Sequence, residues 1–485
     1  MICVPIIGPD MKQALEDISF VNGEADLLEL RLDLIKNFDL KQLVESTGKD
    51  VIVTVRSNRE GGQWDGDVAS AIKELRSALN LGVRFIDVEW HLASELTKEE
   101  LGQAIISRHF FDEFPSNLKS ILDELNEIPG AVTKIAMKID QLEQNAEIFQ
   151  LLRDRRKDTI LIGMGELGRI SRIAARAMGG FLTFAALSSG KESAPGQVTL
   201  AELKNKYYTK NNNQETKLYG VIGNPIGHSM SPDIHNAGFN SIGFNALYLP
   251  LKVERVESFM SELAPYFDGF SVTIPHKEIF FTIADKVEEV VNKIGALNTL
   301  TKLSDGRWEG KNTDISAAID SVIEKLDDKS LKDKRVLVIG AGGAARAIVI
   351  GAKYKGANVT IANRTVSKGQ KIANELEVNF ISLEKIQALA SLDYNVIMNT
   401  TSVGMSPEVD VSPLPKTTFK EEQVVFDAIY NPDKTKLILK AEEDGAKIIT
   451  GREMFVKQGA LQFEHWTKKT CPLTLFREIL NKKLG

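Results

Sequence analysis

The chain has 485 residues, which at roughly 150 residues per domain corresponds to about three domains. Hydrophobic residues make up 43% and charged residues 26%, which argues against a disordered, collagen-like or coiled-coil chain. The formal net charge of −6 does not favour nucleic-acid binding, because domains that bind nucleic acid are usually basic.

Two further features concern the cellular setting. The chain holds two cysteines, Cys3 and Cys471, which argues against a disulfide framework and predicts a reducing compartment. The first residues, MICVPIIGPD, lack the charged region and the cleavage site of a secretory signal. No stretch approaches the ~20 apolar residues needed to span a bilayer. We therefore expect a cytoplasmic protein that binds neither a membrane nor nucleic acid.

Short apolar or β-branched runs recur along the first part of the chain. They cover residues 2–6, 26–31, 51–55, 83–90, 104–109, 132–138, 159–164 and 181–186. Stretches with the apolar spacing of a helix face, such as 67–82, lie between them. Eight strand–helix units predict a (β/α)₈ barrel over residues 1–208, near the lower size limit of that fold. A doubly wound open sheet is the alternative.

Polar residues gather at the predicted strand ends, where barrel enzymes carry their catalytic side chains. They are Glu29, Arg31, Arg56, Glu60, His109, Arg172, Ser193 and Gln197. Lys134 lies inside the sixth strand, where a buried ammonium is costly unless it has a partner or a function. Lys138 has the same parity on that strand and competes with Lys134 for the inward-facing position.

The amino-acid composition changes after the predicted barrel. The polar segment 205–217 predicts a linker, and a new strand begins within 217–223. Four loop motifs follow in a block that spans 218–317. They are GNPIGHSMSPDIHN (223–236), SVTIPHKE (271–278), GALNTL (295–300) and GKNTD (310–314). Their hydroxyl, amide, lysine and aspartate side chains would each be ordinary helix caps or surface groups alone. Together they suggest a site for a polyhydroxylated acid.

The charged stretch 324–334 predicts a solvated helix end, and a second α/β lobe follows over 335–450. This lobe opens with RVLVIGAGGAARAIVIGA, which reads as an apolar strand, a glycine-rich turn and a helix. Gly340, Gly342 and Ala345 fill the G-x-G-x-x-G/A pattern of dinucleotide-binding folds. Glycines there let the backbone approach a pyrophosphate, whose charge the helix N-terminus favours.

The end of the next strand bears on the choice of cofactor. NAD-binding folds usually carry an acidic residue at this point, where it binds the ribose hydroxyls. This chain has Asn363, Arg364 and Thr365 instead. An arginine suits a 2′-phosphate, so the sequence favours NADP over NAD.

Residues 218–485 closely resemble shikimate dehydrogenase in these motifs and in DAIYNP (427–432) and MFVKQGALQFEHW (454–466). The resemblance implies a C-terminal helical segment, 452–485, that folds back onto the middle lobe. It implies that Lys277 holds the C3 oxygen of 3-dehydroshikimate and supplies a proton, while Asp314 keeps this ammonium charged and in place. The substrate contacts that it implies are Ser229, Ser231, Thr273, Asn298, Tyr430 and Gln458. The cofactor contacts are Gly340, Gly342, Gly343, Ala344, Asn363, Arg364 and Thr365.

Residues 1–208 resemble type I 3-dehydroquinate dehydratase, a (β/α)₈ family. The segments that carry the resemblance are LLELRLD (27–33), VRSNREGG (55–62), ISRHF (106–110), TKIAM (133–137), GRISR (168–172) and SAPGQ (193–197). It selects Lys134 over Lys138 as the lysine that forms an imine, makes His109 the general acid–base, and lets Glu60 orient His109. The substrate contacts that it implies are Glu29, Arg31, Arg56, Arg172, Ser193 and Gln197. The basic cluster of arginines would favour the neutral amine that attack requires. Pro5 stands where many members carry a serine.

The whole chain therefore resembles a fused enzyme for two consecutive steps of the shikimate pathway, with NADP(H) as cofactor and no metal. An NAD-dependent quinate/shikimate dehydrogenase is one alternative, but it would call for an acidic residue near position 363. A non-catalytic regulator is another, and such a chain is expected to lose Lys134, His109 or Lys277, all of which are present.

Overall fold

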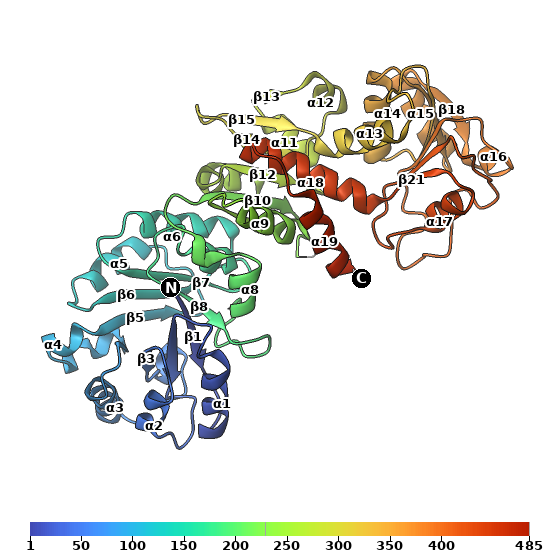
Figure 1. Cartoon of the computed structure of the whole chain (residues 1–485). Coiled ribbons are helices and arrows are strands. Elements are labelled where there is room, and N and C mark those ends of the chain that lie inside the picture. Colours follow the sequence, from blue (N-terminus) through green and yellow to red (C-terminus); the bar gives the residue numbers. More distant parts are fainter. Residues whose placement is uncertain (228, 485) are drawn as a thin grey trace. The chain divides into compact units, whose positions relative to one another are not determined.

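The computed structural model describes residues 1–227 and 229–484, so His228, within the motif 223–236, and Gly485 lie outside the described residues. The chain forms two compact units (Figure 1). Unit 1 comprises Met1–Gly220, Asn224–Gly227 and Gly243–Asp268, and unit 2 comprises the remaining described residues.

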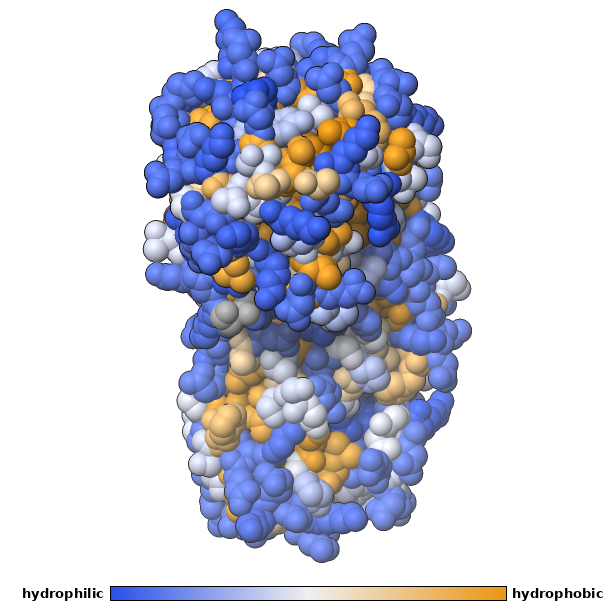
Figure 2. Space-filling view, turned by 90° about the vertical axis from the view of Figure 1, so that its right-hand side faces the viewer, coloured by the Kyte–Doolittle hydropathy of each residue, from blue (hydrophilic) through white to orange (hydrophobic). Residues whose placement is uncertain are grey.

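The surface and the helices bear on the question of a membrane. Among the residues described, no helix has the length and apolar character needed to cross a bilayer. Figure 2 shows one face of the molecule, on which hydrophilic side chains prevail and apolar side chains form scattered groups. Scattered apolar groups of this kind are normal on folded proteins.

Unit 1 contains a curled parallel sheet whose strands follow one another in chain order. They are β1 (Ile2–Ile6), β2 (Leu27–Arg31), β3 (Asp50–Thr54), β4 (Phe85–Glu89), β5 (Ala104–Phe110), β6 (Val132–Lys138), β7 (Thr159–Met164), β8 (Thr183–Ala186) and β9 (Val198–Thr199). The neighbours run β7-β6-β5-β4-β3-β2-β1-β8-β9. The N–H of Phe181, just before β8, donates to the carbonyl of Thr159 at the start of β7 (2.9 Å). The first and last of the eight principal strands around the sheet, β7 and β8, thus meet, which confirms the predicted barrel and excludes the open sheet.

Helices cover the outside of this barrel (Figure 1). They are α1 (Met11–Val21), α2 (Leu40–Glu45), α3 (Val68–Asn80), α4 (Lys98–Leu101), α5 (Leu118–Asn126), α6 (Asn145–Arg153), α7 (Arg169–Ala174) and α8 (Leu200–Asn205). Helix α3 shows why they form: Asp67 caps it by accepting from the N–H of Ser70 (2.8 Å), and its apolar stripe is buried. The strands are buried on both faces, as expected of a parallel sheet flanked by helices.

The polar segment 205–217 is folded against the barrel rather than extended as a free linker. Tyr207 and Thr209 are buried, and the Thr209 hydroxyl donates to the carbonyl of Leu203 (3.1 Å). The Thr216 hydroxyl donates to the side chain of Asn245 (2.6 Å). A polar composition therefore did not indicate exposure here, because hydrogen bonds satisfy the buried polar groups.

A second, mixed sheet has the order β11-β10-β12-β14-β15-β13. Its strands are β10 (Lys217–Gly223), β11 (Ala246–Lys252), β12 (Gly269–Val272), β13 (Lys286–Val287), β14 (Thr299–Lys302) and β15 (Trp308–Lys311). The helices of this region are α9 (Ser231–Ser241), α10 (Val256–Ser258), α11 (Lys277–Ile283), α12 (Glu289–Ile294) and α13 (Thr313–Lys325). Strand β14 runs antiparallel to β12 and β15, so its start lies beside their ends. Three of the sequence motifs therefore meet at one edge of this sheet.

The third sheet is parallel and has the order β18-β17-β16-β19-β20-β21. Its strands are β16 (Arg335–Ile339), β17 (Asn358–Asn363), β18 (Asn379–Ser382), β19 (Val396–Asn399), β20 (Val424–Asp427) and β21 (Lys447–Ile449). The helices are α14 (Gly343–Tyr354), α15 (Val366–Leu376), α16 (Leu383–Gln387), α17 (Lys436–Glu443), α18 (Gly451–Thr467) and α19 (Leu473–Leu484). The strand order reverses at β16, and ligands of such sheets bind at this switch point. The predicted dinucleotide-binding fold is thus confirmed.

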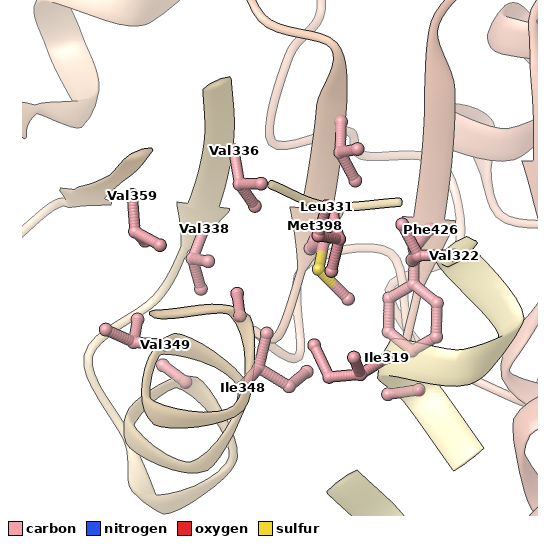
Figure 3. Close-up of a cluster of buried hydrophobic side chains, with 14 of the residues drawn as sticks. Ile319, Val322, Leu331, Val336, Val338, Ile348, Val349, Val359, Met398 and Phe426 are labelled. Atoms are coloured by element: carbon pink, nitrogen blue, oxygen red, sulfur yellow. The ribbon is translucent and has the colours of Figure 1, made fainter. Parts of the chain in front are cut away.

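The core of the third sheet lies behind the glycine-rich turn (Figure 3). Val338 of β16, Val349 of α14 and Phe426 of β20 are completely buried, and Met398 of β19 is 1% exposed. In Figure 3 these side chains converge on one interior between the sheet and its helices. This packing holds β16 and α14 in fixed relation, and thereby fixes the turn that joins them.

We expect Phe426→Ala to lower the free energy of unfolding by about 3–5 kcal/mol, because it leaves a cavity in this core. Leu439→Ala on α17 is the matched control; this side chain is 46% exposed, and its loss should change stability by less than about 0.5 kcal/mol. Denaturant titration followed by circular dichroism measures both. Equal losses in the two variants would contradict the assignment of this core.

Candidate active sites

A pocket opens at the C-terminal ends of the barrel strands. Its empty volume is about 560 Å³, part of which is open solvent. All of the residues that the sequence proposed for the barrel line this one pocket: Glu29, Arg31, Arg56, Glu60, His109, Lys134, Arg172, Ser193 and Gln197. Pro5 is buried in β1, outside this lining. The structure therefore brings together residues that six different strands, helices and loops supply.

Lys134 points into this pocket from the middle of β6. Its side chain is 7% exposed, and its Nζ donates to Asp87 Oδ2 (2.8 Å) and lies 3.8 Å from Glu29 Oε1. The same nitrogen sits 4.5 Å from the centroid of the Phe184 ring. Lys134 therefore has two carboxylates as its nearest charged neighbours, which the expectation of a purely basic surrounding did not include.

Lys138, the competitor on the same strand, lies in a different environment. Its side chain is 44% exposed and pairs with Asp140 (Nζ to Oδ1, 2.9 Å). The two lysines share a strand face, but Lys138 is the last residue of β6, at the rim of the barrel. Burial thus separates the two lysines where strand parity could not.

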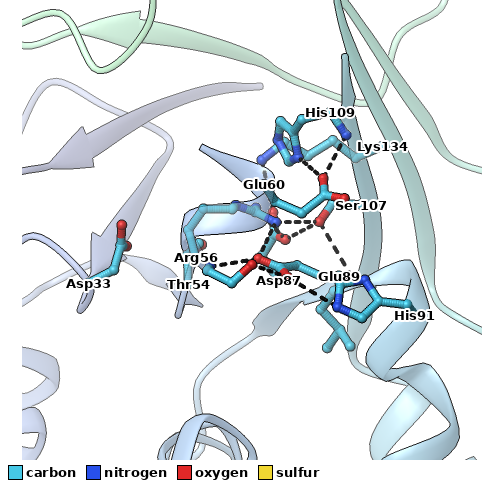
Figure 4. A network of polar contacts seen from close by, with 12 residues as sticks. Asp33, Thr54, Arg56, Glu60, Asp87, Glu89, His91, Ser107, His109 and Lys134 are labelled. Atoms are coloured by element: carbon cyan, nitrogen blue, oxygen red, sulfur yellow. Dashed lines mark hydrogen bonds and ion pairs between the residues drawn. The ribbon is translucent and has the colours of Figure 1, made fainter. Parts of the chain in front are cut away.

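Asp87 of β4 lies beneath Lys134 and is 1% exposed (Figure 4). Its Oδ1 accepts from Arg56 Nη2 (2.7 Å) and from Ser107 Oγ (2.5 Å). Burial acts to raise the pKa of Asp87, but Arg56 and Lys134 outweigh it, so the pKa lies well below its usual range. The sequence pattern did not reveal this residue, because it lies within a strand. An acid inside the apolar run 83–90 was the signal that could have found it.

His109 and Glu60 form a second polar pair in the pocket. Glu60 Oε2 accepts from the backbone N–H of His109 (2.8 Å) and lies 3.0 Å from Nδ1 of the ring. Burial, followed by the charges of Arg56 and Lys134, holds the pKa of His109 well below its usual range. Burial also raises the pKa of Glu60. A neutral imidazole that donates its Nδ1–H hydrogen bond to Glu60 leaves Nε2 free to accept a proton.

The neighbouring strands set the spacing of the two reactive side chains. In the pairing of β5 with β6, Ser107 lies beside Lys134 and His109 lies beside Ala136. The ring of Phe111 stacks on that of His109 at 5.8 Å and 12° and also lines the pocket. Phe111 was another residue that the sequence did not reveal, because an aromatic after a strand has no distinctive pattern.

Arg172 and Gln197 supply hydrogen-bond donors on another side of the pocket. Arg172 is 2% exposed, and burial together with Arg169 lowers its pKa to about 10. Gln197 accepts from the N–H of Ser193 (2.8 Å), while its Nε2 is buried and has no hydrogen-bond partner among the described residues. A buried donor without a partner is unfavourable unless a ligand satisfies it, so this side of the pocket suits an oxygen-rich ligand.

A second polar site lies at the edge of the mixed sheet. Lys277 is the first residue of α11 and Asp314 lies in the first turn of α13. Their Nζ and Oδ2 atoms are 2.6 Å apart, and the side chains are 34% and 26% exposed. The pair is thus half-buried and remains accessible to a ligand.

Asn298 holds the start of α13 beside this pair. Its Oδ1 accepts from the backbone N–H of Thr313 (2.8 Å), and its Nδ2 donates to the Thr313 hydroxyl (3.0 Å). Gln462 of α18 donates to the Asn298 carbonyl (3.1 Å) and to the Thr299 hydroxyl (3.0 Å). Helix α18 thus returns to the middle sheet. Gln462 was missed because it lies one helical turn beyond Gln458, in a stretch that had only the family motif to guide it.

The remaining predicted substrate contacts are placed as follows. The N–H of Ser231, at the start of α9, donates to Ser229 Oγ (3.3 Å). Thr273 follows β12 and is half-buried, and Gln458 is buried on α18, where its Nε2 donates to a backbone carbonyl of its own helix. Tyr430 is 46% exposed, and its ring lies 6.1 Å from that of Phe455 on the same α18.

The glycine-rich turn after β16 has the geometry of a phosphate cradle. Gly340 adopts a φ of +126°, and a Cβ there would approach Thr400 Oγ1 to 2.5 Å, so only glycine fits. No atom lies within 4 Å of a Cβ added at Gly342 or Gly343, so the space before the first turn of α14 is open. The N–H groups of that turn can therefore receive a pyrophosphate.

The residues at the end of β17 bear on the choice between NADP and NAD. Arg364 is exposed there, and Asn363 Nδ2 donates to the carbonyl of Thr365 (2.8 Å), which fixes the turn. The adenosine ribose of a dinucleotide bound along this edge would lie near the guanidinium of Arg364, and residues 363–365 include no carboxylate. The residues present therefore fit a 2′-phosphate.

Fold and sites together define a barrel with an inward-facing lysine, joined to a two-lobed α/β reductase. Comparison with known families agrees along the whole chain. Residues 2–214 match type I 3-dehydroquinase, and residues 221–300 match the shikimate dehydrogenase substrate binding domain. Residues 322–432 match shikimate / quinate 5-dehydrogenase, and residues 451–480 match the shikimate 5′-dehydrogenase C-terminal domain.

Individual relatives give the same result. The bifunctional 3-dehydroquinate dehydratase/shikimate dehydrogenase of Arabidopsis thaliana, described as chloroplastic, is 38% identical over 99% of this chain and 84% of its own. The shikimate dehydrogenase (NADP(+)) of Shouchella clausii is 40% identical over 52% of this chain and 93% of its own. A crystal structure of shikimate dehydrogenase in complex with NADP+ is 35% identical, with a TM-score of 0.50 over 56% of this chain and 97% of that one. The chain belongs to the family of bifunctional 3-dehydroquinate dehydratase/shikimate dehydrogenases. It is a multifunctional enzyme that combines a lyase with an oxidoreductase.

The lowered pKa of His109 has a measurable consequence. We expect its imidazole to remain neutral at about pH 6, where an ordinary histidine is already mostly protonated. The unfolded chain would bind this proton at higher pH than the folded one, so the contribution of His109 to stability falls as the pH drops below about 6.5. ¹⁵N NMR of the ring nitrogens measures the protonation state. A cationic ring at about pH 6 in the folded protein would contradict this assignment.

Proposed function

We propose that the barrel dehydrates 3-dehydroquinate to 3-dehydroshikimate and that the two-lobed part then reduces 3-dehydroshikimate to shikimate with NADPH. The observation that carries the proposal is the buried Lys134, which shares one pocket with the His109–Glu60 pair. The half-buried Lys277–Asp314 pair carries the second activity. The two reactions are consecutive steps of the shikimate pathway, which leads to the aromatic amino acids.

We assign the activities to three stretches of chain. Residues 1–208 would form the dehydratase. Residues 218–317 would form the substrate lobe of the dehydrogenase, together with the C-terminal segment 452–485. Residues 335–450 would form the NADP lobe. The hydrogen bonds from α18 to Asn298 and Thr299 support the inclusion of the C-terminal segment in the substrate lobe.

Dehydration would begin at Lys134. Its Nζ attacks the ketone carbon of 3-dehydroquinate, and loss of water leaves an imine that withdraws electrons from the neighbouring carbon. His109 removes the proton from that carbon and then protonates the departing hydroxyl. Glu60 holds the ring in the orientation that both transfers require. Both of these proton transfers use the same nitrogen, Nε2 of a ring whose pKa favours the neutral form.

Donors around the pocket would bind the rest of this acid. The buried Arg172 suits the carboxylate, because a guanidinium binds a carboxylate with two parallel hydrogen bonds. Gln197 brings an unpartnered Nε2 and holds Ser193 beside it. Arg31, Arg56 and Glu29 complete the ring of charged groups in the pocket lining. We propose all six as substrate contacts.

Reduction would take place at the Lys277–Asp314 pair. NADPH, when bound, supplies the hydride for this reduction. The Lys277 ammonium binds the ketone oxygen and supplies the proton as that oxygen becomes a hydroxyl. Asp314 Oδ2, 2.6 Å from the ammonium, keeps it charged and in position.

The remaining polar groups of the dehydrogenase would hold the ring substituents. We propose Ser229 and Ser231 as contacts of the carboxylate. Thr273, Asn298 and Gln458 would contact ring hydroxyls, with Tyr430 nearby. The Asn298 amide already bonds to Thr313, so it acts on the substrate from a fixed position.

NADP is the cofactor that the nucleotide lobe accommodates. Gly340, Gly342, Gly343 and Ala344 would bind the pyrophosphate through the start of α14. Asn363, Arg364 and Thr365 would bind the 2′-phosphate. An NAD-dependent quinate dehydrogenase is disfavoured, because NAD has no 2′-phosphate that the cation at position 364 could bind. Relatives from several bacteria are likewise named for NADP(+).

We also propose a cytoplasmic location. Cys3 and Cys471 are buried free thiols, which a reducing compartment preserves. Thiol labelling of the protein from intact cells, carried out after denaturation so that the buried thiols are accessible and read by mass spectrometry, should label both cysteines; unlabelled, oxidised cysteines would contradict this location.

Borohydride reduction in the presence of 3-dehydroquinate should trap a covalent adduct on Lys134, because hydride converts the imine into a stable amine. Peptide mass spectrometry locates the adduct. Lys134→Ala should remove it, while the matched variant Lys138→Ala should leave both the adduct and the dehydration rate unchanged. In the unaltered protein, recovery of the adduct on Lys138 would refute the assignment.

Replacing Lys277 by alanine should lower NADPH-dependent reduction of 3-dehydroshikimate by at least ~100-fold, the usual effect of removing a general acid. Dehydration of 3-dehydroquinate should stay unchanged, because Lys134 and its neighbours are untouched. Lys286→Ala removes an exposed lysine of the same sheet and is the control. A parallel loss of both activities would show that the two sites are not separate.

A further inference from the structure

The barrel contains a buried charge that the proposed roles do not use. Asp87 is 1% exposed and lies on β4, a strand to which the sequence assigned no site residue. Its Oδ2 accepts the hydrogen bond of Lys134 Nζ at 2.8 Å, so it contacts the nitrogen that forms the imine. In Figure 4 Asp87 lies below Lys134 and His109, and it is not among the residues that line the pocket. Asp87 thus contacts the reacting atom from behind.

Asp87 is badly suited to accept the proton that Lys134 must lose. Its other oxygen, Oδ1, accepts from the Arg56 guanidinium at 2.7 Å and from the Ser107 hydroxyl at 2.5 Å. A carboxylate that accepts from a guanidinium, an ammonium and a hydroxyl is stabilised as the anion. The side chain therefore keeps its negative charge through the working pH range, and proton transfer belongs to His109.

We propose that Asp87 is the counter-ion of the positively charged imine nitrogen on Lys134, a role that rests on the proposed dehydratase activity. The nitrogen stays at the end of the same lysine side chain when the imine forms. Its remaining N–H can then donate to Oδ2 as the ammonium does in the structure. The charge that the chemistry requires on nitrogen thus has a fixed partner before substrate arrives.

The charge on this nitrogen changes during the reaction while Asp87 stays the same. Lys134 first gives an ammonium proton to His109, and its Nζ electron pair then bonds to the ketone carbon. The oxygen takes that proton from His109 and a second one from the nitrogen and leaves as water, which produces the cationic imine. His109 removes the neighbouring C–H proton, and that electron pair forms a C=C bond as the C=N pair moves onto nitrogen, giving a neutral enamine. The enamine electrons expel the hydroxyl, which takes the proton from His109, and the cationic imine returns. Water then releases the product ketone and the free amine.

A counter-ion must hold the cation without binding it too strongly. Full pairing would oppose the step in which the nitrogen becomes neutral. Arg56 meets this requirement because it binds the opposite oxygen of the same carboxylate and shares its charge. Glu29 lies further away, at 3.8 Å from Nζ, and supplies a weaker negative field.

The Asp87–Lys134 pair has a well-defined set of charged and titratable neighbours. They come from the first five strands of the barrel and the loop after β3: Cys3, Glu29, Arg31, Arg56, Glu60, Glu89 and His109. All of these groups can influence the pH dependence of the dehydration rate. The effect of Asp87 is therefore measured as the difference between the pH–rate profiles of the variant and of the unaltered protein.

Replacing Asp87 by asparagine removes the charge and keeps the shape. Attack on the ketone requires the free amine of Lys134, and the following proton removal requires the protonated imine. Loss of the negative charge lowers the proton affinity of this nitrogen in both states. Both limbs of the pH–rate profile should therefore move to lower pH. We expect a shift of about one pH unit, which corresponds to about a tenfold loss on the alkaline limb. A residue with a merely structural role would scale the whole profile and leave its optimum in place.

Two further variants complete the test in the full-length chain. Asp87→Glu retains the charge on a longer side chain, and we expect a lower rate with an unchanged optimum. Asp140→Asn removes the carboxylate of the exposed Lys138–Asp140 pair and should leave the profile as it is. An unmoved optimum in Asp87→Asn overturns the proposal. If that variant does not fold, a shifted optimum in Asp87→Glu overturns it instead.

The borohydride adduct separates this inference from the proposed function. If the unaltered protein gives no adduct on Lys134, the proposed dehydratase activity fails and the counter-ion fails with it. If the adduct forms in the unaltered protein and the Asp87→Asn profile keeps its optimum, only the counter-ion is wrong.

Discussion

The barrel site depends on keeping two cations and two anions buried side by side. Arg56 and Lys134 carry the positive charges, and Asp87 and Glu29 carry the negative ones. An isolated buried charge is strongly unfavourable, so each of these groups is tolerable only while the others are present. The parallel barrel meets this requirement because the alternate strands β2, β4 and β6 point Glu29, Asp87 and Lys134 into one interior layer. The nucleophile is therefore held by the same balance of charges that the fold needs for its stability.

Hydrophobic periodicity predicted the fold well, because the barrel strands and the third sheet are buried on both faces and follow their apolar runs closely. The mixed middle sheet gave a weaker signal, since β13 and β15, on one side of it, are short and partly exposed. Composition predicted a linker at 205–217, but it could not predict that hydrogen bonds hold part of this segment against the barrel. Tyr207 and Thr209 are buried there despite their polar neighbours.

Most of the site residues that could be predicted lie near strand ends. His109 lies near the end of β5 and Glu60 follows β3, where the barrel architecture directs attention. Asp87 and Ser107 lie inside apolar runs and contribute through contacts that only the strand register brings about. In the dehydrogenase, the family motifs located Lys277 and Asp314, but Gln462 needed the path of α18 in space. Lys134 itself could be chosen over Lys138 only by resemblance, and its low exposure now gives a physical reason.

Helix α18 begins two residues after β21 of the nucleotide sheet and ends with Trp466 donating to the Leu300 carbonyl of the middle sheet. Its 17 residues correspond to a rod of about 25 Å. A rod of fixed length between two sheets sets the separation of whatever each sheet binds. Helix α13 also connects these two sheets along the chain and packs against α18, so the reach from a bound nicotinamide ring to its substrate depends on the lengths of two paired helices. One helical turn of either corresponds to about 5.4 Å.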